Sequence, residues 1–202
     1  MKTILLAGFE PFGGSNINPS IEACKPHNGK KYNDCIVKVV EIPLLYNEIK
    51  PSLVKAIEET KPSAVICTGQ SGSGDIRLER VAINIADARI PYNCGTQPVD
   101  KTIVVNGPVA YFSTLPLRKL LEELNEAKIP SVISNTAGTF GCNHIFYELM
   151  HHRAEKDLDI PAGFIHVPSL PQQVIGKTRP SMAQSLITVA LGVVMETLSI
   201  KL

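Results

Sequence analysis

Short apolar runs rich in β-branched residues alternate along this chain with longer stretches that have the periodicity of amphipathic helices. The runs predict strands at residues 3–7, 36–42, 64–68, 81–86, 131–134 and 163–167. The periodic stretches predict helices at residues 18–27, 46–60, 114–128, 143–156 and 181–202. Such alternation favours a mainly parallel sheet with helices on both faces. No repeat or change of composition marks a linker, so we predict a single α/β domain over residues 1–202.

The composition is that of a folded protein without a strong overall charge. Hydrophobic residues make up 44% of the chain, which excludes a disordered protein and is enough for a sizeable core. The 20 Lys and Arg residues are balanced by 19 Asp and Glu residues, leaving a net charge of +1. Because this balance supplies no strong field, we expect neither nucleic acid nor a membrane surface as a partner.

Three features predict a cytoplasmic location. The apolar run at the start of the chain ends at once before Glu10, too early for a signal peptide. The uncharged segment 180–195 falls short of the ~20 residues needed to span a bilayer, so it predicts a buried or interface helix. The five cysteines form no CxxC motif and no regular framework, which favours free thiols in a reducing compartment.

In sheets of this kind the binding crevice lies at the carboxyl ends of the strands, so we expect functional residues in the loops that follow the strands. The loop GFEPFGG at residues 8–14 has neither the GxGxxG pattern nor the Lys-Ser/Thr of a phosphate-binding loop. Its two phenylalanines, Phe9 and Phe12, instead predict an apolar wall. The alternative is a loop that packs only on itself.

Cys142 is the candidate nucleophile. It follows the loop SNTAGTFG and lies where the helix predicted at 143–156 begins. The free N–H groups and positive dipole of a helix N-terminus stabilise a thiolate and can hold an oxyanion. The alternative reading is a small hydrophobic residue at a helix start.

A cysteine nucleophile needs a base and a group that orients the base. His166 lies at the end of the strand predicted at 163–167, where it would open into the crevice. Glu79 continues the alternation of Val81 and Ile83, so its carboxylate would lie on the same apolar strand face. A carboxylate on an apolar face needs a partner for its charge. The alternatives are a core histidine and a surface carboxylate.

The other cysteines and histidines carry weaker signals. Structural roles are favoured for Cys24, Cys35, Cys67 and Cys94, although Cys94 lies in an exposed-looking loop. The remaining pattern of interest is a helix that carries three histidines. No HExxH motif or acidic cluster completes a metal site around His144, His151 and His152, so we predict no metal and no cofactor.

Four segments together resemble the pyrrolidone-carboxyl peptidase family, also called pyroglutamyl peptidase type I, over essentially the full chain. They are GFEPFGG with the following NPS, LERVAINIADARIP, SNTAGTFGCN and GFIHVPSLPQQ. The resemblance implies a cysteine peptidase that removes N-terminal pyroglutamate from peptides. It assigns the nucleophile to Cys142, the catalytic histidine to His166 and the catalytic glutamate to Glu79. It also implies a three-layer α/β/α sandwich and a homotetramer in the cytosol.

A pyroglutamyl ring is a neutral lactam, which favours an apolar slot with a few matched hydrogen bonds. Phe9, Phe12 and Phe140 are the predicted walls of that slot. Gln70 and Asn18 are the predicted residues that read the lactam. Arg89, in the family-like sequence DARIP, is the predicted second donor to the oxyanion, beside the backbone N–H of Cys142.

The sequence also departs from the family pattern near the predicted site. The glycine-rich turn at 69–76 is one residue short, and Arg77 stands where Ser or Thr is common. Thr136 replaces Ser, Gly141 replaces an apolar residue, and Cys94 replaces an acidic one. Two other functions therefore stay open: a nucleotide-type binding protein, and a family member that binds pyroglutamyl peptides without cleaving them.

Overall fold

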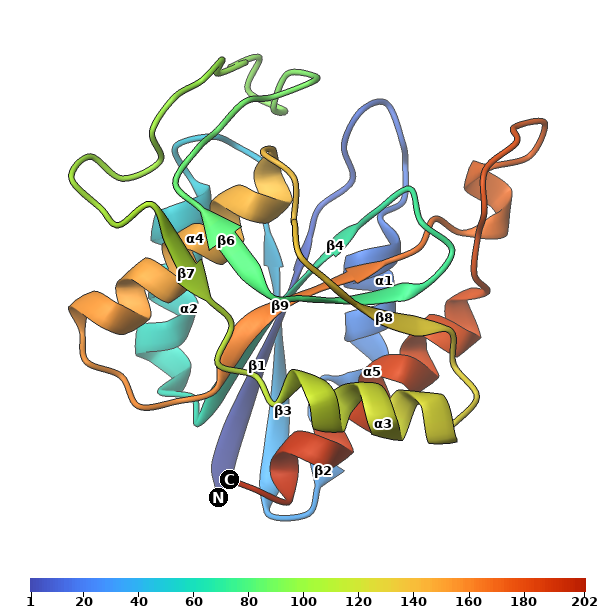
Figure 1. Cartoon of the computed structure of the whole chain (residues 1–202). Coiled ribbons are helices and arrows are strands. Elements are labelled where there is room, and N and C mark those ends of the chain that lie inside the picture. The colour runs from blue at the N-terminus through green and yellow to red at the C-terminus, as the bar shows by residue number, and fades with distance from the viewer.

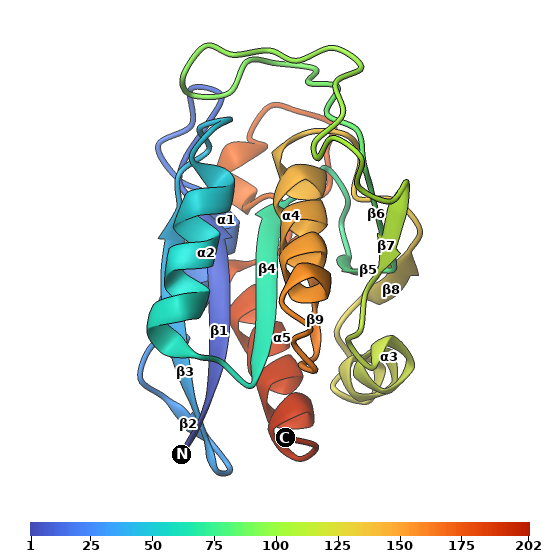
Figure 2. The same ribbon diagram turned by 90° about the vertical axis from the view of Figure 1, so that its left-hand side faces the viewer.

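A computed structural model describes residues 1–202 and has a mixed sheet between two layers of helices. Helices α2 (Ile49–Thr60) and α4 (Gly141–Glu155) lie on one side of the sheet. Helices α1 (Pro19–Cys24), α3 (Leu117–Glu126) and α5 (Gln184–Ser199) lie on the other side (Figure 1). Figure 2 looks onto α2 and α4, with the strands behind them. The predicted three-layer α/β/α sandwich is confirmed.

The main sheet has seven strands in the order β2-β3-β1-β4-β9-β5-β8. Their bounds are β1 Lys2–Phe9, β2 Lys31–Tyr32, β3 Cys35–Ile42, β4 Ala64–Gln70, β5 Ile76–Glu79, β8 Ser131–Ser134 and β9 Ala162–Val167. Strands β3, β1, β4 and β9 are parallel, as predicted. Strand β5 is antiparallel to β9 and parallel to β8, so the strand direction reverses between β9 and β5.

The central strands are buried on both faces, which explains their continuous apolar sequences. Ile4, Leu6 and Ile66 point into the core under α1, α3 and α5. Leu5 and Val65, which alternate with them, point into the core under α2 and α4. The sheet therefore separates two apolar cores. The register between neighbouring strands decides which of their side chains point into the same core.

Most helices are shorter than predicted, whereas α4 begins two residues earlier and ends one residue earlier than predicted. In α2 the apolar face at Ile49, Leu53, Ala56 and Ile57 is buried, and Pro51 occupies the first turn, where a proline costs no hydrogen bond. Helix α2 stops at Lys61, which has a φ of 43°, before Pro62. In α3 four leucines recur at helical spacing, Leu117, Leu120, Leu121 and Leu124, and only Leu120 and Leu124 are fully buried. None of the helices combines the length and apolar character needed to cross a bilayer.

The strand predicted at 81–86 is wrong in one important respect. The chain forms β5 up to Glu79, and β6 (Val81–Ile83) then begins a separate two-stranded sheet with β7 (Ala110–Phe112). Glu79 therefore does not share a strand face with Val81 and Ile83. A long connection, residues 84–109, joins β6 to β7 and lies at the end of the molecule opposite the two termini (Figures 1 and 2).

Two glycines differ in the space that surrounds them: Gly8 is in close contact with a helix, and Gly192 is not. Gly8 of β1 lies so close to α1 that a Cβ atom there would be 2.7 Å from the backbone Cα and N of Ile21. Gly192 of α5 has room, because its nearest neighbours to a Cβ atom would be His27 and Tyr32 at 3.5 Å and 3.6 Å. The same substitution should therefore have opposite effects at the two positions.

We expect Gly8→Ala to lower the free energy of unfolding by about 1–3 kcal/mol, because backbone atoms of α1 must move. The matched variant Gly192→Ala should raise it by about 0.5–1 kcal/mol, because alanine favours a helix interior. Urea unfolding of both variants checks this. Equal changes of the same sign would contradict the close approach at Gly8.

Candidate active site

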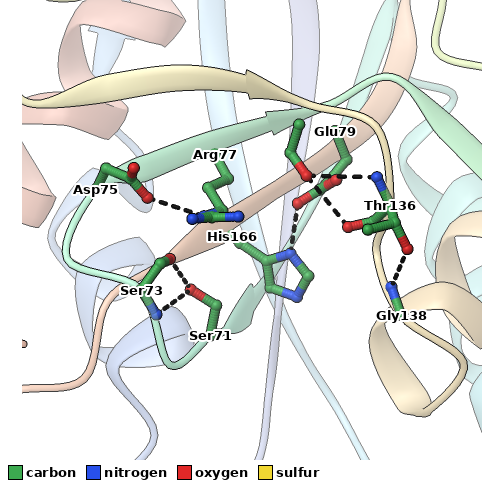
Figure 3. Close-up of polar contacts among 9 residues, drawn as sticks. Ser71, Ser73, Asp75, Arg77, Glu79, Thr136, Gly138 and His166 are labelled. Carbon is green, nitrogen blue, oxygen red and sulfur yellow. Dashed lines mark hydrogen bonds and ion pairs between the residues drawn. The ribbon is translucent and has the colours of Figure 1, made fainter. Parts of the chain in front are cut away.

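A buried carboxylate and an imidazole form the centre of the candidate site. Glu79, at the end of β5, is fully buried, and its Oε1 lies 2.7 Å from Nδ1 of His166 on β9 (Figure 3). The antiparallel register pairs Glu79 with Phe164 and Arg77 with His166, so these side chains share one face of the sheet. Because a carboxylate only accepts, Nδ1 donates its proton to Glu79, and Nε2 is left for chemistry.

This pairing sets the charge of the histidine. Burial disfavours the imidazolium, but the neighbouring Cys142 sulfur and the Glu79 carboxylate outweigh burial and raise the pKa of His166 to about 9. His166 is 7% exposed, so the paired ring still borders solvent. At neutral pH the ring is therefore a proton donor beside a sulfur atom.

Cys142 is the second residue of α4 and a partly exposed free thiol. Phe140 caps the helix in an extended conformation without a side-chain hydrogen bond. The N–H groups of the first turn have no partner within the helix. The predicted position of Cys142 at a helix start is confirmed.

The sulfur of Cys142 packs directly against Gly69 of β4. A Cβ atom at this position would be 2.6 Å from the sulfur of Cys142 and 2.8 Å from the ring of Phe164. Gly69 also pairs with His166 in the β4–β9 ladder. A side chain at 69 would therefore displace the sulfur of Cys142 or the ring of Phe164. Sequence reasoning noted the glycine-rich turn but missed this role, because a steric contact between β4 and α4 leaves no local pattern.

The other four cysteines have different surroundings. Burial raises the pKa of the thiols of Cys24, Cys35 and Cys67, to about 12 for Cys24, so these are poor nucleophiles. Cys94 is exposed in the 84–109 connection, and hydrogen bonding with Thr96 lowers its pKa. No histidine influences the pKa of Cys94, whereas the sulfur of Cys142 raises the pKa of His166.

The remaining histidines are part of the packing of α1 and α4. His144 is buried against Tyr92, and burial lowers the pKa of His144 to about 4. His151 bonds to Tyr111, and His27 to Tyr32 and the carbonyl of Thr188. The chain contains no group of three or more His, Cys, Asp and Glu side chains that could hold a metal ion.

A polar depression of about 430 Å³ opens beside His166, and we call it the catalytic depression. Its walls come from the turn after β4, from β5 and β9, and from the loop after β8 (Figure 3). They include Ser71, Ser73, Arg77, Glu79, Thr136, Gly138 and His166.

A second pocket, of about 480 Å³, adjoins the first through Ser71 and Gly72, and we call it the loop pocket. Three predicted substrate residues line it: Phe12, Gln70 and Arg89. Phe140 packs on Phe12, with ring centroids 6.2 Å apart. The loop pocket lies over β1, β4 and β9, whereas the catalytic depression lies on the β5 and β8 side.

Phe9 and Asn18 lie deeper than the sequence suggested. Phe9 is 2% exposed and belongs to the core under α2 and α4. Asn18 is 1% exposed and caps α1, where its Oδ1 accepts from Ser20 and its Nδ2 donates to the carbonyl of Glu10. Both ends of this carboxamide are thus engaged within the protein, because the cap takes precedence at a helix start.

Further residues support the site without any sequence pattern that identifies them. Asn143, next to the nucleophile, bonds to backbone groups of Ile83 and Ile85 and thereby ties β6 to α4. Leu44 fills the space beside Gly141, where a Cβ atom would be 2.4 Å from its Cδ1. This contact explains why Gly141 lacks the apolar side chain expected from the resemblance.

Comparison with known proteins gives a consistent result. The family described as pyroglutamyl peptidase matches residues 2–201. The pyrrolidone-carboxylate peptidase of Brevibacillus brevis is 50% identical over 200 residues, covering 98% of this chain and 93% of the relative. The pyrrolidone-carboxylate peptidase of Vibrio campbellii is 45% identical, covering 95% of this chain and 90% of the relative.

Solved structures agree with these relatives. The pyroglutamyl peptidase I of Bacillus amyloliquefaciens superposes with a TM-score of 0.96 at 42% identity, covering 98% of this chain and 95% of the other. A mutant pyrrolidone carboxyl peptidase of Pyrococcus furiosus gives 0.95 at 40% identity, covering 98% and 99%. With the family match spanning the strands and the helix that bring Glu79, His166 and Cys142 together, this chain belongs to the pyroglutamyl peptidase family.

Proposed function

We propose that this chain is a cysteine peptidase that hydrolyses the amide bond after an N-terminal pyroglutamyl residue, with Cys142 as nucleophile. The observation that carries the proposal is the 2.7 Å contact between buried Glu79 and His166, next to a thiol at a helix N-terminus. A base oriented by a third group beside a nucleophile is the arrangement that nucleophilic acyl transfer requires.

Because His166 is protonated at neutral pH, its Nε2 already holds the proton of Cys142 in a thiolate–imidazolium pair. In the first step, the thiolate attacks the pyroglutamyl carbonyl. A carbon–sulfur bond forms, and the negative oxygen accepts hydrogen bonds from the N-terminus of α4. Arg89 is the second donor in this proposal, because it lines the adjoining loop pocket. The carbon–nitrogen bond then breaks as His166 returns its proton to the leaving amine.

In the second step, water gives a proton to His166 and attacks the thioester, which releases pyroglutamate and the thiol of Cys142. Glu79 favours the imidazolium in both steps and holds the ring with Nε2 toward the sulfur. The proposal therefore gives Glu79 an orienting and electrostatic role.

The neutral lactam fits the aromatic side of the loop pocket. Phe12 offers an apolar wall, with Phe140 packed against its ring, and Gln70 offers amide groups for hydrogen bonding. We assign Phe9 and Asn18 to shaping the floor and the loop of that pocket, since both are buried.

We also infer a homotetramer that works in the cytoplasm. The family resemblance suggests the assembly, and five free thiols suit a reducing compartment. Light scattering of the purified protein should give about four times the mass of one chain. A mass of one chain at working concentration would contradict the tetramer.

The test of the proposed function is release of a fluorescent amine from a pyroglutamyl amide, beside the matched prolyl amide. We expect turnover of the first and rejection of the second by at least about a thousand-fold, because proline lacks the ring carbonyl. Binding of the pyroglutamyl compound without turnover would support a protein that only binds. Saturable nucleotide binding without turnover would favour the nucleotide-type alternative.

Two cysteine variants serve as controls for that assay. Cys142→Ser should lose activity by a factor on the order of a thousand or more. Cys94→Ser, which removes the other accessible thiol, should keep it. Near wild-type activity of folded Cys142→Ser would mean that the nucleophile is misassigned.

The pH dependence tests the role of Glu79. In the wild type, kcat/KM should fall as pH rises through about 9, where His166 loses the proton needed by the leaving amine. Glu79→Gln removes a charge that raises the pKa of His166, so the alkaline limb should move to lower pH. The value of kcat should also fall by at least about ten-fold. An unchanged limb in the variant would remove Glu79 from this role.

A further inference from the structure

Arg77 is a charged side chain of the catalytic depression that the proposed mechanism leaves unused. It lies on β5 opposite His166 in the β5–β9 ladder, and both residues line the depression (Figure 3). The family resemblance leads one to expect a short hydroxyl side chain at this position. In this chain a guanidinium group takes its place, directly across the ladder from the catalytic imidazole.

The guanidinium is held in place but not used up. Its Nε donates to Oδ1 of Asp75 at 2.8 Å, and its other N–H groups donate to no acceptor in the protein. Asp75 does not line the depression, so its carboxylate anchors the arginine from behind. The terminal N–H groups form the planar fork that binds carboxylates in a bidentate manner.

The rest of the catalytic depression is polar and carries little opposing charge. Its other charged groups are Glu79 and His166, which are paired with each other. The hydroxyl groups of Ser71, Ser73 and Thr136 complete the polar wall. Arg77 is thus the one charged side chain of the depression with hydrogen-bond donors left for a ligand.

The reaction decides which part of a substrate lies in this depression. The amine that leaves must receive its proton from His166, which lines the catalytic depression and not the loop pocket. The lactam is assigned to the adjoining loop pocket, which lies over β1, β4 and β9. The first residue of the released peptide therefore lies on the same side as Arg77.

We propose that Arg77 makes this enzyme prefer pyroglutamyl peptides with a carboxylate close to the cleaved bond. The carboxylate comes either from an acidic first residue of the released peptide or from the free C-terminus of a pyroglutamyl dipeptide. This inference rests on the proposed peptidase function and names the substrate class within it.

The test compares kcat/KM for four substrates that differ only after pyroglutamate: the glutamate amide, the alanine amide, the lysine amide and free alanine. The wild type should favour glutamate over alanine amide by about ten-fold and disfavour lysine, as expected for a partly exposed charged hydrogen bond. A preference for free alanine over its amide would assign the C-terminal carboxylate as a second source.

Variants locate the preference. Arg77→Ser should reduce the glutamate-to-alanine ratio by about ten-fold, and Arg77→Lys should restore part of it. Arg80→Ser is the matched control, because Arg80 is the next cation on the chain and bonds to Asn135 outside the catalytic depression. The Arg80→Ser ratio should equal that of the wild type.

An unchanged ratio in folded Arg77→Ser, or an equal loss in Arg80→Ser, would overturn the inference while leaving the peptidase function intact. Absence of turnover for all four substrates would overturn the proposed function and this inference with it. High salt should weaken the wild-type preference, because a partly exposed ion contact is screened.

Discussion

The hydrogen bond between Glu79 and His166 is the interaction on which the site depends. A fully buried carboxylate costs several kcal/mol in lost hydration unless a charged partner compensates. Here the partner is the imidazole of His166. The carboxylate favours the protonated form of this ring, and the attraction between the two charges offsets the lost hydration. The contact exists because β5 runs antiparallel to β9 and brings Glu79 diagonally next to His166. The reversal of strand direction is therefore what brings the two side chains of the candidate site together.

Cys142, the proposed nucleophile, is placed by close packing instead of by polar contacts. Helix α4 begins directly over β4, and only a glycine at 69 lets the sulfur of Cys142 lie against that strand. Gly141 permits a similar approach of Leu44 on the other side of the helix start. Because protein interiors resist shifts of even one methyl group, these two glycines limit the positions open to the sulfur.

The charge pattern of the chain agrees with the substrate proposed for it. A pyroglutamyl end carries no ammonium group, so a protein with a net charge of +1 needs no strong field to attract it. Aromatic walls at Phe12 and Phe140 suit that neutral ring. In the proposal, the free donors of Arg77 lie in the catalytic depression, apart from the loop pocket that receives the ring, so the ring and the residue after it are recognised at different places.

The sequence by itself determined the α/β class and most of the strands, and it singled out Glu79, Cys142 and His166 as candidates, because periodicity and short motifs are local properties. It did not determine how these residues meet. Predicting Glu79 on one strand with Val81 failed because nothing local marks the break at Arg80, where the chain leaves one sheet for another. The buried capping role of Asn18 and the contact at Gly69 were decided by tertiary structure alone, since register and close approach join residues far apart in the chain.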